Sequence, residues 1–247
     1  MRYLILADIH GNSDALEEVL ARAAEEGFDD LLVLGDLVGY GAGPDEVVET
    51  VRERVKPEHV IRGNHDKVVA AIEDGENFNE VALAAARWTR DAMKEENLEY
   101  VRGLQQGPVL TESGAVICHG TPRDEDEYLL SLEQAAELFE LEQRPLTLFG
   151  HTHLPMMIAR YGSKLELSVL KGGGEDLELV PGRQYLFNPG SVGQPRDRDP
   201  RAAFAIYDSE AGLLHWRRVD YPVEVAQRRI QEAGLPPVLA YRLSVGV

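Results

Sequence analysis

The stretch Arg62-Gly63-Asn64-His65-Asp66 follows the short apolar run of residues 59–61 and precedes a segment of helical character. This order predicts that Asn64, His65 and Asp66 lie in the turn leaving the carboxyl end of a strand, where open α/β sheets bind ligands. A neutral oxygen ligand, an imidazole and a carboxylate in succession suit a metal-assisted phosphate site. Since Asp66 could be only a helix N-cap, the assignment depends on matching residues elsewhere in the chain.

Two earlier strands end in similar polar residues. A buried strand over residues 2–8 ends at Asp8 and His10, and a second over residues 31–34 ends at Asp36. Amphipathic helices are expected between these strands, which favours βαβ units and a parallel sheet. Three strand ends would then meet at a single rim.

The remaining elements follow from periodicity and turn residues. Ser13 or Asp14 can cap the helix after the first strand, and Pro44 opens the next helix. Residues 67–100 are expected to be mostly helical, and Gly172-Gly173-Gly174 to lie in a loop. Further strands are expected at residues 109–111, 115–118, 146–149, 156–161, 164–170, 184–187, 203–208 and 213–219, and further helices at residues 131–141 and 223–233. No internal repeat or long linker divides the chain, so we expect residues 1–247 to form one domain.

Composition narrows the partners and the compartment. The formal charge of −18 opposes binding to a polyphosphate backbone, so general nucleic-acid binding is not expected. No apolar run approaches the ~20 residues of a membrane span. The single cysteine, Cys118, excludes an internal disulfide framework and fits a reducing compartment, so we expect a cytoplasmic protein. The oligomeric state stays open, and a homo-oligomer is one possibility.

Most of the histidines gather where strands are predicted to end. His59 and His215 instead lie within strands or at their starts, and for those two a structural role is the better interpretation. The other five of the seven histidines have no structural reason to be at strand ends: His10, His65, His119, His151 and His153.

The chemistry of these residues indicates metal binding. Asp8 and His10 lie two apart on an extended segment, which places both side chains on one side, and His151 and His153 repeat that spacing. Nitrogen and oxygen ligands without thiolates suit Mn²⁺, Fe or Zn²⁺ rather than Ca²⁺ or Mg²⁺, and Mn²⁺ is our first choice. Seven ligands exceed the needs of one ion, whereas two ions ~3.5–4 Å apart can share a bridging carboxylate. The candidates are Asp8, His10, Asp36, Asn64, His119, His151 and His153.

In order along the chain, these residues resemble the motifs of the calcineurin-like metallophosphoesterase family. The matching motifs are Asp8-x-His10, Gly35-Asp36, Gly63-Asn64-His65-Asp66, His119-Gly120 and Gly150-His151-Thr152-His153. The match runs from residue 3 to about residue 195, and residues 188–193 further resemble the small bacterial phosphodiesterase branch. The resemblance implies an α/β fold in which a two-sheet β-sandwich is flanked by helices in four layers, with the metals at strand ends.

The resemblance also implies the roles of the catalytic groups and the ligands of each metal ion. It implies a hydroxide between the ions as the nucleophile. His65 would be the residue that stabilises the phosphoryl charge or protonates the leaving alkoxide of a small phosphodiester or phosphomonoester. It assigns one ion to Asp8, His10, Asp36 and His153, and the second to Asp36, Asn64, His119 and His151, so that Asp36 bridges them.

One departure from the family bears on the substrate. Serine/threonine phosphatases and dinucleoside tetraphosphatases of this family carry an Asp-Arg pair three and four positions after the bridging Asp, where this chain has Gly39 and Tyr40. A phosphoprotein or dinucleoside tetraphosphate substrate is therefore disfavoured. Asp66 could support His65 instead, and Arg196 or Arg198 could contact the phosphate. For both arginines a solvated surface charge is the alternative.

Two other functions could use the same scaffold. A non-catalytic interaction module would have lost metal ligands, whereas this chain keeps every expected position. A nuclease would use the same metal site but needs a basic approach surface, which the net charge opposes.

Overall fold

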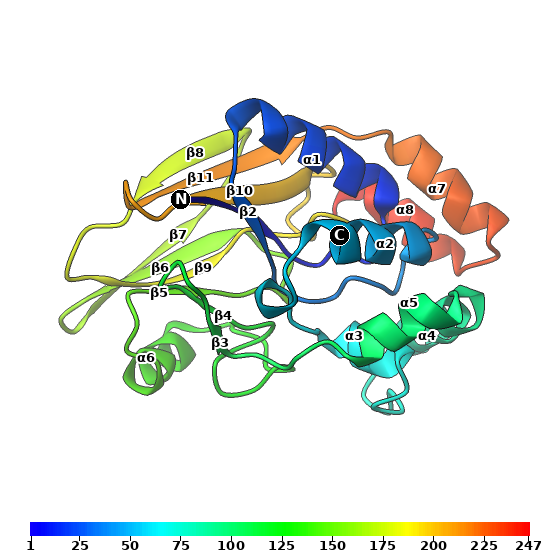
Figure 1. Cartoon of the computed structure of the whole chain (residues 1–247), viewed down its shortest axis with the longest axis horizontal. Helices are drawn as coiled ribbons and strands as arrows, with labels where there is room; N and C mark the ends of the chain where they lie inside the picture. Colours follow the sequence, from blue (N-terminus) through cyan, green and yellow to red (C-terminus); the bar gives the residue numbers. More distant parts are fainter.

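The computed structural model describes residues 1–247 and contains two mixed β-sheets that pack against each other, with helices outside both (Figure 1). The strands are β1 (Arg2–Leu6), β2 (Asp30–Val33), β3 (Val109–Leu110), β4 (Val116–Ile117), β5 (Leu146–Leu148), β6 (Met156–Tyr161), β7 (Lys164–Val169), β8 (Gly174–Glu178), β9 (Gln184–Asn188), β10 (Ala202–Asp208) and β11 (Leu213–Val219). The five-stranded sheet has the order β2-β1-β10-β11-β8, and the six-stranded sheet has the order β3-β4-β5-β9-β6-β7.

The helices lie mostly on the side of the five-stranded sheet. They are α1 (Ser13–Glu26), α2 (Pro44–Arg54), the 3₁₀ turn η1 (Pro57–His59), α3 (Asn64–Val69), α4 (Glu80–Ala92), α5 (Glu95–Arg102), α6 (Leu132–Leu141), α7 (Val223–Glu232) and α8 (Pro237–Val245). Figure 1 places α6 on the opposite side of the sheets from α1, α7 and α8. None of these helices has the length and apolar character needed to cross a membrane.

Side chains of one strand alternate between two cores, because successive residues of a strand point to opposite faces. On β1, Leu4 and Leu6 pack toward α1, α2, α7 and α8, whereas Tyr3 and Ile5 pack against the second sheet. A third, smaller core joins α6 to the outer face of the six-stranded sheet. The order helix, sheet, sheet, helix confirms the predicted four-layer α/β sandwich.

Several predictions about local structure were wrong. Only β1–β2 and β4–β5–β9 pair in parallel, so both sheets are mixed. The expected strand at residues 59–61 is replaced by η1 and by two isolated bridges at Val60 and Ile61. The side chain of Asn12, rather than that of Ser13 or Asp14, caps α1 by accepting a hydrogen bond from the Ala15 amide (3.1 Å).

Two elements were missed in the second half of the chain. Strand β8 has an almost entirely exposed, polar sequence without an alternating pattern, and it begins at Gly174, so the glycine run is not wholly a loop. Helix α8 opens at Pro237 after a second proline, Pro236, and has little amphipathic character. Its buried side is set by packing on α7 rather than by a visible periodicity.

The carboxyl ends of the parallel strands meet at one place and are tied together by hydrogen bonds. The His10 amide donates to the Asp36 carbonyl (2.9 Å), which joins the loops after β1 and β2. The Gly150 amide donates to the His119 carbonyl (2.8 Å), which joins the loops after β4 and β5. The His151 amide donates to Asp8 Oδ1 (3.0 Å) and so links the two sheets.

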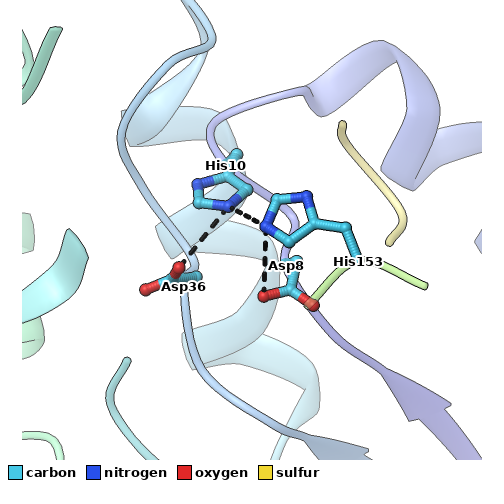
Figure 2. Close-up of side chains that lie close together, drawn as sticks. All are labelled: Asp8, His10, Asp36 and His153. Carbon is cyan, nitrogen blue, oxygen red and sulfur yellow. Dashed lines mark hydrogen bonds and ion pairs between the residues drawn. The ribbon is translucent and has the colours of Figure 1, made fainter. Parts of the chain in front are cut away.

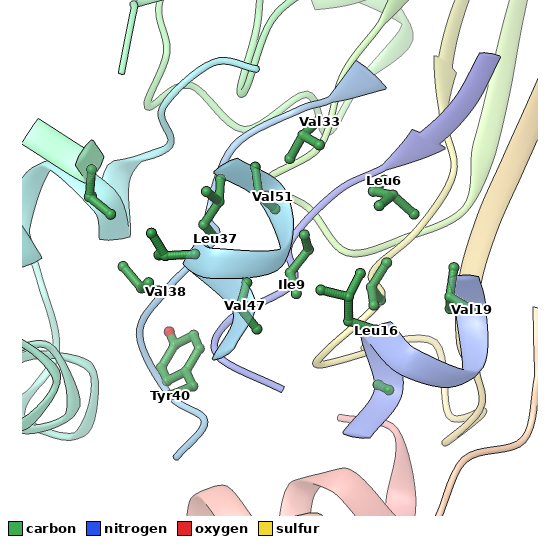
Figure 3. Close-up of a cluster of buried hydrophobic side chains, with 14 of the residues drawn as sticks. Leu6, Ile9, Leu16, Val19, Val33, Leu37, Val38, Tyr40, Val47 and Val51 are labelled. Carbon is green, nitrogen blue, oxygen red and sulfur yellow. The ribbon is translucent and has the colours of Figure 1, made fainter. Parts of the chain in front are cut away.

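Apolar neighbours fix two of these loops from the helix side. Ile9, between Asp8 and His10, and Leu37, next to Asp36, are fully buried in the core beneath α1 and α2 (Figure 3). Fully burying such a side chain stabilises the fold by roughly 1.5–3 kcal/mol. The loops that carry the polar residues are therefore rigidly anchored.

Candidate metal centre

Asp8, His10, Asp36 and His153 form a buried cluster in which every side chain faces the others (Figure 2). The Nε2 atoms of His10 and His153 are 3.1 Å apart, and His10 Nε2 lies 3.5 Å from Asp36 Oδ2. His153 Nε2 lies 3.6 Å from Asp8 Oδ1. One potential ligand atom from each residue lies within 4.8 Å of those of the others, which is close enough for a single cation to contact all four.

A second cluster of Asp36, His119 and His151 adjoins the first and shares the Asp36 carboxylate. His119 Nε2 lies 3.4 Å from Asp36 Oδ2 and 3.2 Å from Asn64 Oδ1. The amide oxygen of Asn64 is therefore a fourth candidate ligand. All seven residues predicted as ligands come together in these two clusters.

Backbone carbonyls set the orientation of four imidazoles. The Nδ1 atoms of His10, His119 and His153 hydrogen bond to the carbonyls of Val38 (3.2 Å), Leu34 (2.8 Å) and Gln194 (2.6 Å). In His151 the outer nitrogen is Nε2, 3.1 Å from the Asp126 carbonyl, which leaves Nδ1 to face the cluster. Metal-binding histidines in proteins are typically held in this way through their second ring nitrogen.

Backbone strain coincides with the two clusters. Five residues of the clusters have positive φ angles: Asp8 (54°), His10 (50°), Asp36 (54°), His151 (65°) and His153 (59°). Non-glycine residues in this region cost of order 1–3 kcal/mol each and concentrate at functional sites. The hydrogen bonds between the loops and the anchors Ile9 and Leu37 hold the strained backbone in place.

The protonation of the two clusters reflects deep burial and crowded charges. Burial raises the pKa of Asp8 to about 7 and lowers that of His151 to about 3. Burial opposes protonation of His119, but Asp36, Asp8 and the Leu34 carbonyl outweigh it and raise its pKa to about 10. The pKa of His10 is lowered well below its usual value, mainly by burial, so its contact with Asp36 is not an ion pair. A protonated His119 thus balances the carboxylates without a metal, and a bound cation would replace that proton.

The residues present fit a pair of divalent cations. Asp8 Oδ2 is buried and has no hydrogen-bond partner, which is costly unless a ligand satisfies it. The facing nitrogens of His10 and His153 are likewise arranged to bind one ion between them. Imidazole, carboxylate and amide donors together suit Mn²⁺, Fe or Zn²⁺.

His65 lies beside the clusters without belonging to either. Its amide donates to Asp36 Oδ1 (2.9 Å), and its ring packs among those of His10, Tyr40 and Phe78. Its Nδ1 is buried without a partner and faces Gly39, where a Cβ atom would come within 2.6 Å of it. A side chain at position 39 would therefore collide with the His65 ring as it lies here.

The Asp66 carboxylate accepts hydrogen bonds from backbone amides. Its Oδ2 accepts from the Gly63 amide (2.9 Å) and its Oδ1 from the Val38 amide (3.2 Å), so both oxygens are engaged and neither contacts the His65 ring. The interpretation that Asp66 orients His65 is not supported by these contacts. Asp66 is the third residue of α3 and closes the first turn of that helix instead.

The two arginines considered as phosphate contacts differ in position. Arg196 is half-buried, hydrogen bonds to the Gln194 side chain (3.1 Å) and is close enough to lower the pKa values of His153 and His10. Arg198 is exposed, has a φ of 71° and donates its amide to the Gly246 carbonyl (2.7 Å). Of the two, Arg196 is the one positioned near the site.

Aromatic residues around the centre were missed by the sequence reasoning. Tyr128 stacks on the His151 ring at 3.8 Å between centroids, and Tyr40 packs on His10 at 4.7 Å. Single aromatic residues in loops carry no spacing signal. By contrast, the structural interpretation of His59 and His215 agrees with their contacts to Asp30 and Asp176 outside the site.

Comparisons with known proteins agree with this geometry. The model of the calcineurin-like phosphoesterase superfamily domain matches residues 1–212. An uncharacterized protein of Methanocaldococcus jannaschii is 33% identical over 249 residues, covering 98% of this chain and 97% of that protein. The phosphodiesterase YfcE of Escherichia coli is 24% identical over 221 residues, covering 85% and 89% of the two chains. The crystal structure of a metallophosphoesterase from Sphaerobacter thermophilus has a TM-score of 0.88 at 39% identity, with 100% and 99% of the chains covered.

The fold and the buried polar clusters thus define a metallophosphoesterase. This chain belongs to the calcineurin-like phosphoesterase superfamily, as its motifs predicted. It is a metal-dependent phosphoesterase and therefore a hydrolase.

Proposed function

We propose that the protein is a dinuclear enzyme that hydrolyses a small phosphodiester or phosphomonoester. The observation that carries this proposal is the sharing of Asp36 between two clusters of potential ligands, Asp8/His10/Asp36/His153 and Asp36/Asn64/His119/His151. When bound, two divalent ions would supply Lewis acidity to the phosphoryl oxygens and lower the pKa of a water so that it attacks as hydroxide. Mn²⁺ is our first choice, with Fe or Zn²⁺ as alternatives.

His65 would act on the phosphoryl group as a hydrogen-bond donor. Burial lowers its pKa to about 4, so the ring is neutral at pH 7 and donates one N–H rather than carrying a charge. Because Nδ1 faces Gly39, the other nitrogen, Nε2, is the one that can reach substrate. Charge compensation for the phosphate would come from Arg196, whose positive charge lowers the pKa values of His10, His65 and His153.

The surroundings of the site favour a small substrate. The cavity next to the centre is lined by carboxylates and by no lysine or arginine, which disfavours a nucleic-acid strand. We also propose a cytoplasmic location, because the buried thiol of Cys118 is unpaired.

A phosphodiester assay tests the proposal. Protein reconstituted with Mn²⁺ should hydrolyse bis-p-nitrophenyl phosphate, and the same preparation with excess chelator should not. Elemental analysis of protein purified without added metal should find two equivalents per chain. An absence of any metal-dependent release of p-nitrophenol, with the fold intact by circular dichroism, would overturn the proposal.

A further inference from the structure

A cavity of about 350 Å³ opens directly beside the second cluster. Asn64, His65 and His151 form its wall toward the metal centre. A group attached to a phosphate held at the centre would therefore extend into this cavity. Its size suits a small organic group.

Three aromatic side chains, Tyr40, Phe78 and Tyr128, also line the cavity. Tyr128 is 42% exposed even though one face of its ring stacks on His151 at 3.8 Å. Tyr40 and Phe78 both pack on His65, with centroids 4.3 Å and 4.6 Å from that ring. Contacts with the histidines of the site hold these rings in place. Tyr128 and the half-buried Phe78 are accessible to a ligand, whereas Tyr40 is only 7% exposed and supports the wall from behind.

The charge of the cavity is negative. Glu73, Asp74, Glu76 and Asp126 line it, and no lysine or arginine does. Lys67 balances two of them, since its Nζ lies 2.8 Å from both Glu73 and Asp126. Asp74 and Glu76 are exposed at the rim and form no ion pair. The buried His65 ring completes the wall toward the metal centre.

We propose that this cavity binds a positively charged alcohol, so that the substrate is the phosphate ester of an amino alcohol, best of a quaternary ammonium alcohol. This inference rests on the proposed phosphoesterase function and names the substrate class of that same site. Aromatic faces attract cations, and carboxylates add to the attraction without needing directed hydrogen bonds. A second phosphate or a carboxylate in the alcohol would instead meet the unpaired charges of Asp74 and Glu76. The positive charge of the metal centre is thus matched to the phosphate and the negative cavity to the ammonium group.

A pair of isosteric substrates isolates the charge. Choline phosphate and 3,3-dimethylbutyl phosphate have the same shape, but only the first carries a positive charge. The holoenzyme should cleave choline phosphate with a kcat/KM at least about tenfold higher, mainly through a lower KM. Equal values, or faster cleavage of glycerol phosphate or of nucleoside monophosphates, would overturn the inference.

A double variant then tests which residues provide the preference. Asp74→Asn with Glu76→Gln should reduce the ratio of kcat/KM between the two substrates several-fold. The matched control is Glu53→Gln with Glu58→Gln, which removes the same charge from exposed positions outside the cavity and should keep the ratio. If both double variants change the ratio equally, the preference comes from net charge and not from this cavity.

A binding experiment separates this inference from the proposed function. Calorimetry on the metal-loaded protein should detect binding of choline and much weaker binding of 3,3-dimethylbutanol, and Phe78→Leu should weaken the former several-fold. If bis-p-nitrophenyl phosphate is cleaved but choline is neither bound nor preferred as an ester, only the inference about substrate class is wrong. If no ester is cleaved while choline binds, the proposed function fails and the cavity assignment stands.

Discussion

The two clusters that share Asp36 differ in what surrounds them. In the first, Asp8, His10 and His153 are at most 1% exposed, and no cavity of appreciable size adjoins them. In the second, His151 is 4% exposed and Asn64 is half-buried, and both line the cavity of about 350 Å³. The first cluster is therefore enclosed by protein and the second faces the place where substrate can enter.

From this difference we expect ions at the two clusters to have different roles. Structural metal sites are closed by protein ligands, whereas catalytic sites keep a position open for water or substrate. The enclosed cluster has four candidate side-chain ligands on loops that are tied to both sheets, so an ion there would be held tightly. The cavity-facing cluster has the amide oxygen of Asn64 as one of its candidate ligands and space beside it, so an ion there would exchange and contact substrate more readily.

The largest expected effect comes from replacing Asp36, the carboxylate that both clusters share. Asp36→Asn should lower the metal content from two equivalents toward zero and reduce phosphodiester hydrolysis to below about one hundredth, since losing even an outer-shell partner costs 10–100-fold. Elemental analysis and the bis-p-nitrophenyl phosphate assay measure the two effects. Asp30→Asn is the matched control, because Asp30 is a buried carboxylate that pairs with Lys56 away from the site. Retention of both ions in Asp36→Asn would rule out a bridging role.

The next test concerns a residue on the cavity side that is not a ligand. His65→Ala should lower kcat by about a hundredfold, typical for loss of a proton-transferring or hydrogen-bonding group at the phosphoryl centre, with metal content unchanged. Asp66→Asn is the informative comparison. Because the Asp66 carboxylate accepts from the Gly63 and Val38 amides, this variant should lower thermal stability with little change in kcat. An equal loss of metal in His65→Ala would mean that His65 is a ligand.

The two clusters can also be separated from each other. His151→Ala should remove the ion of the cavity-facing cluster alone, whereas His153→Ala should remove the ion of the enclosed cluster. On titration with a chelator, the wild-type protein should lose its first equivalent faster than its second, and His151→Ala should show only the slow phase. Simultaneous release of both equivalents from the wild-type protein would contradict the proposed difference between the clusters.

How much the sequence predicts differs between the centre and its surroundings. The convergence of the seven candidate ligands was predictable because short loops at strand ends keep them at fixed places relative to strong patterns such as residues 2–8 and 31–34. The cavity was not, because Tyr128 and Phe78 come from loops that have no periodicity and reach the site only through tertiary contacts. Asp66 illustrates a third case, since its position near His65 was predicted but its hydrogen bonds to backbone amides depend on how two loops pack.

The smallest expected effect comes from a variant that weakens contacts on the cavity side only and leaves the enclosed cluster intact. Lys67 is buried, with 2% of its side chain exposed, and its Nζ contacts Glu73, Glu125 and Asp126 at 2.8–3.1 Å. These contacts hold the segment that carries the Asp126 carbonyl bonded to His151 and the ring of Tyr128.

Lys67→Met should destabilise the protein by about 2 kcal/mol. The loss stays below the ~3–5 kcal/mol typical of a broken buried pair, because Arg62 still pairs with Glu125 (3.0 Å) and two of the carboxylates are partly solvated. Urea unfolding measures this loss. The KM for small esters should rise several-fold, while the slowly released metal equivalent is unchanged, because no ligand of the enclosed cluster depends on Lys67. A loss of that equivalent would show that the two clusters are not mechanically independent.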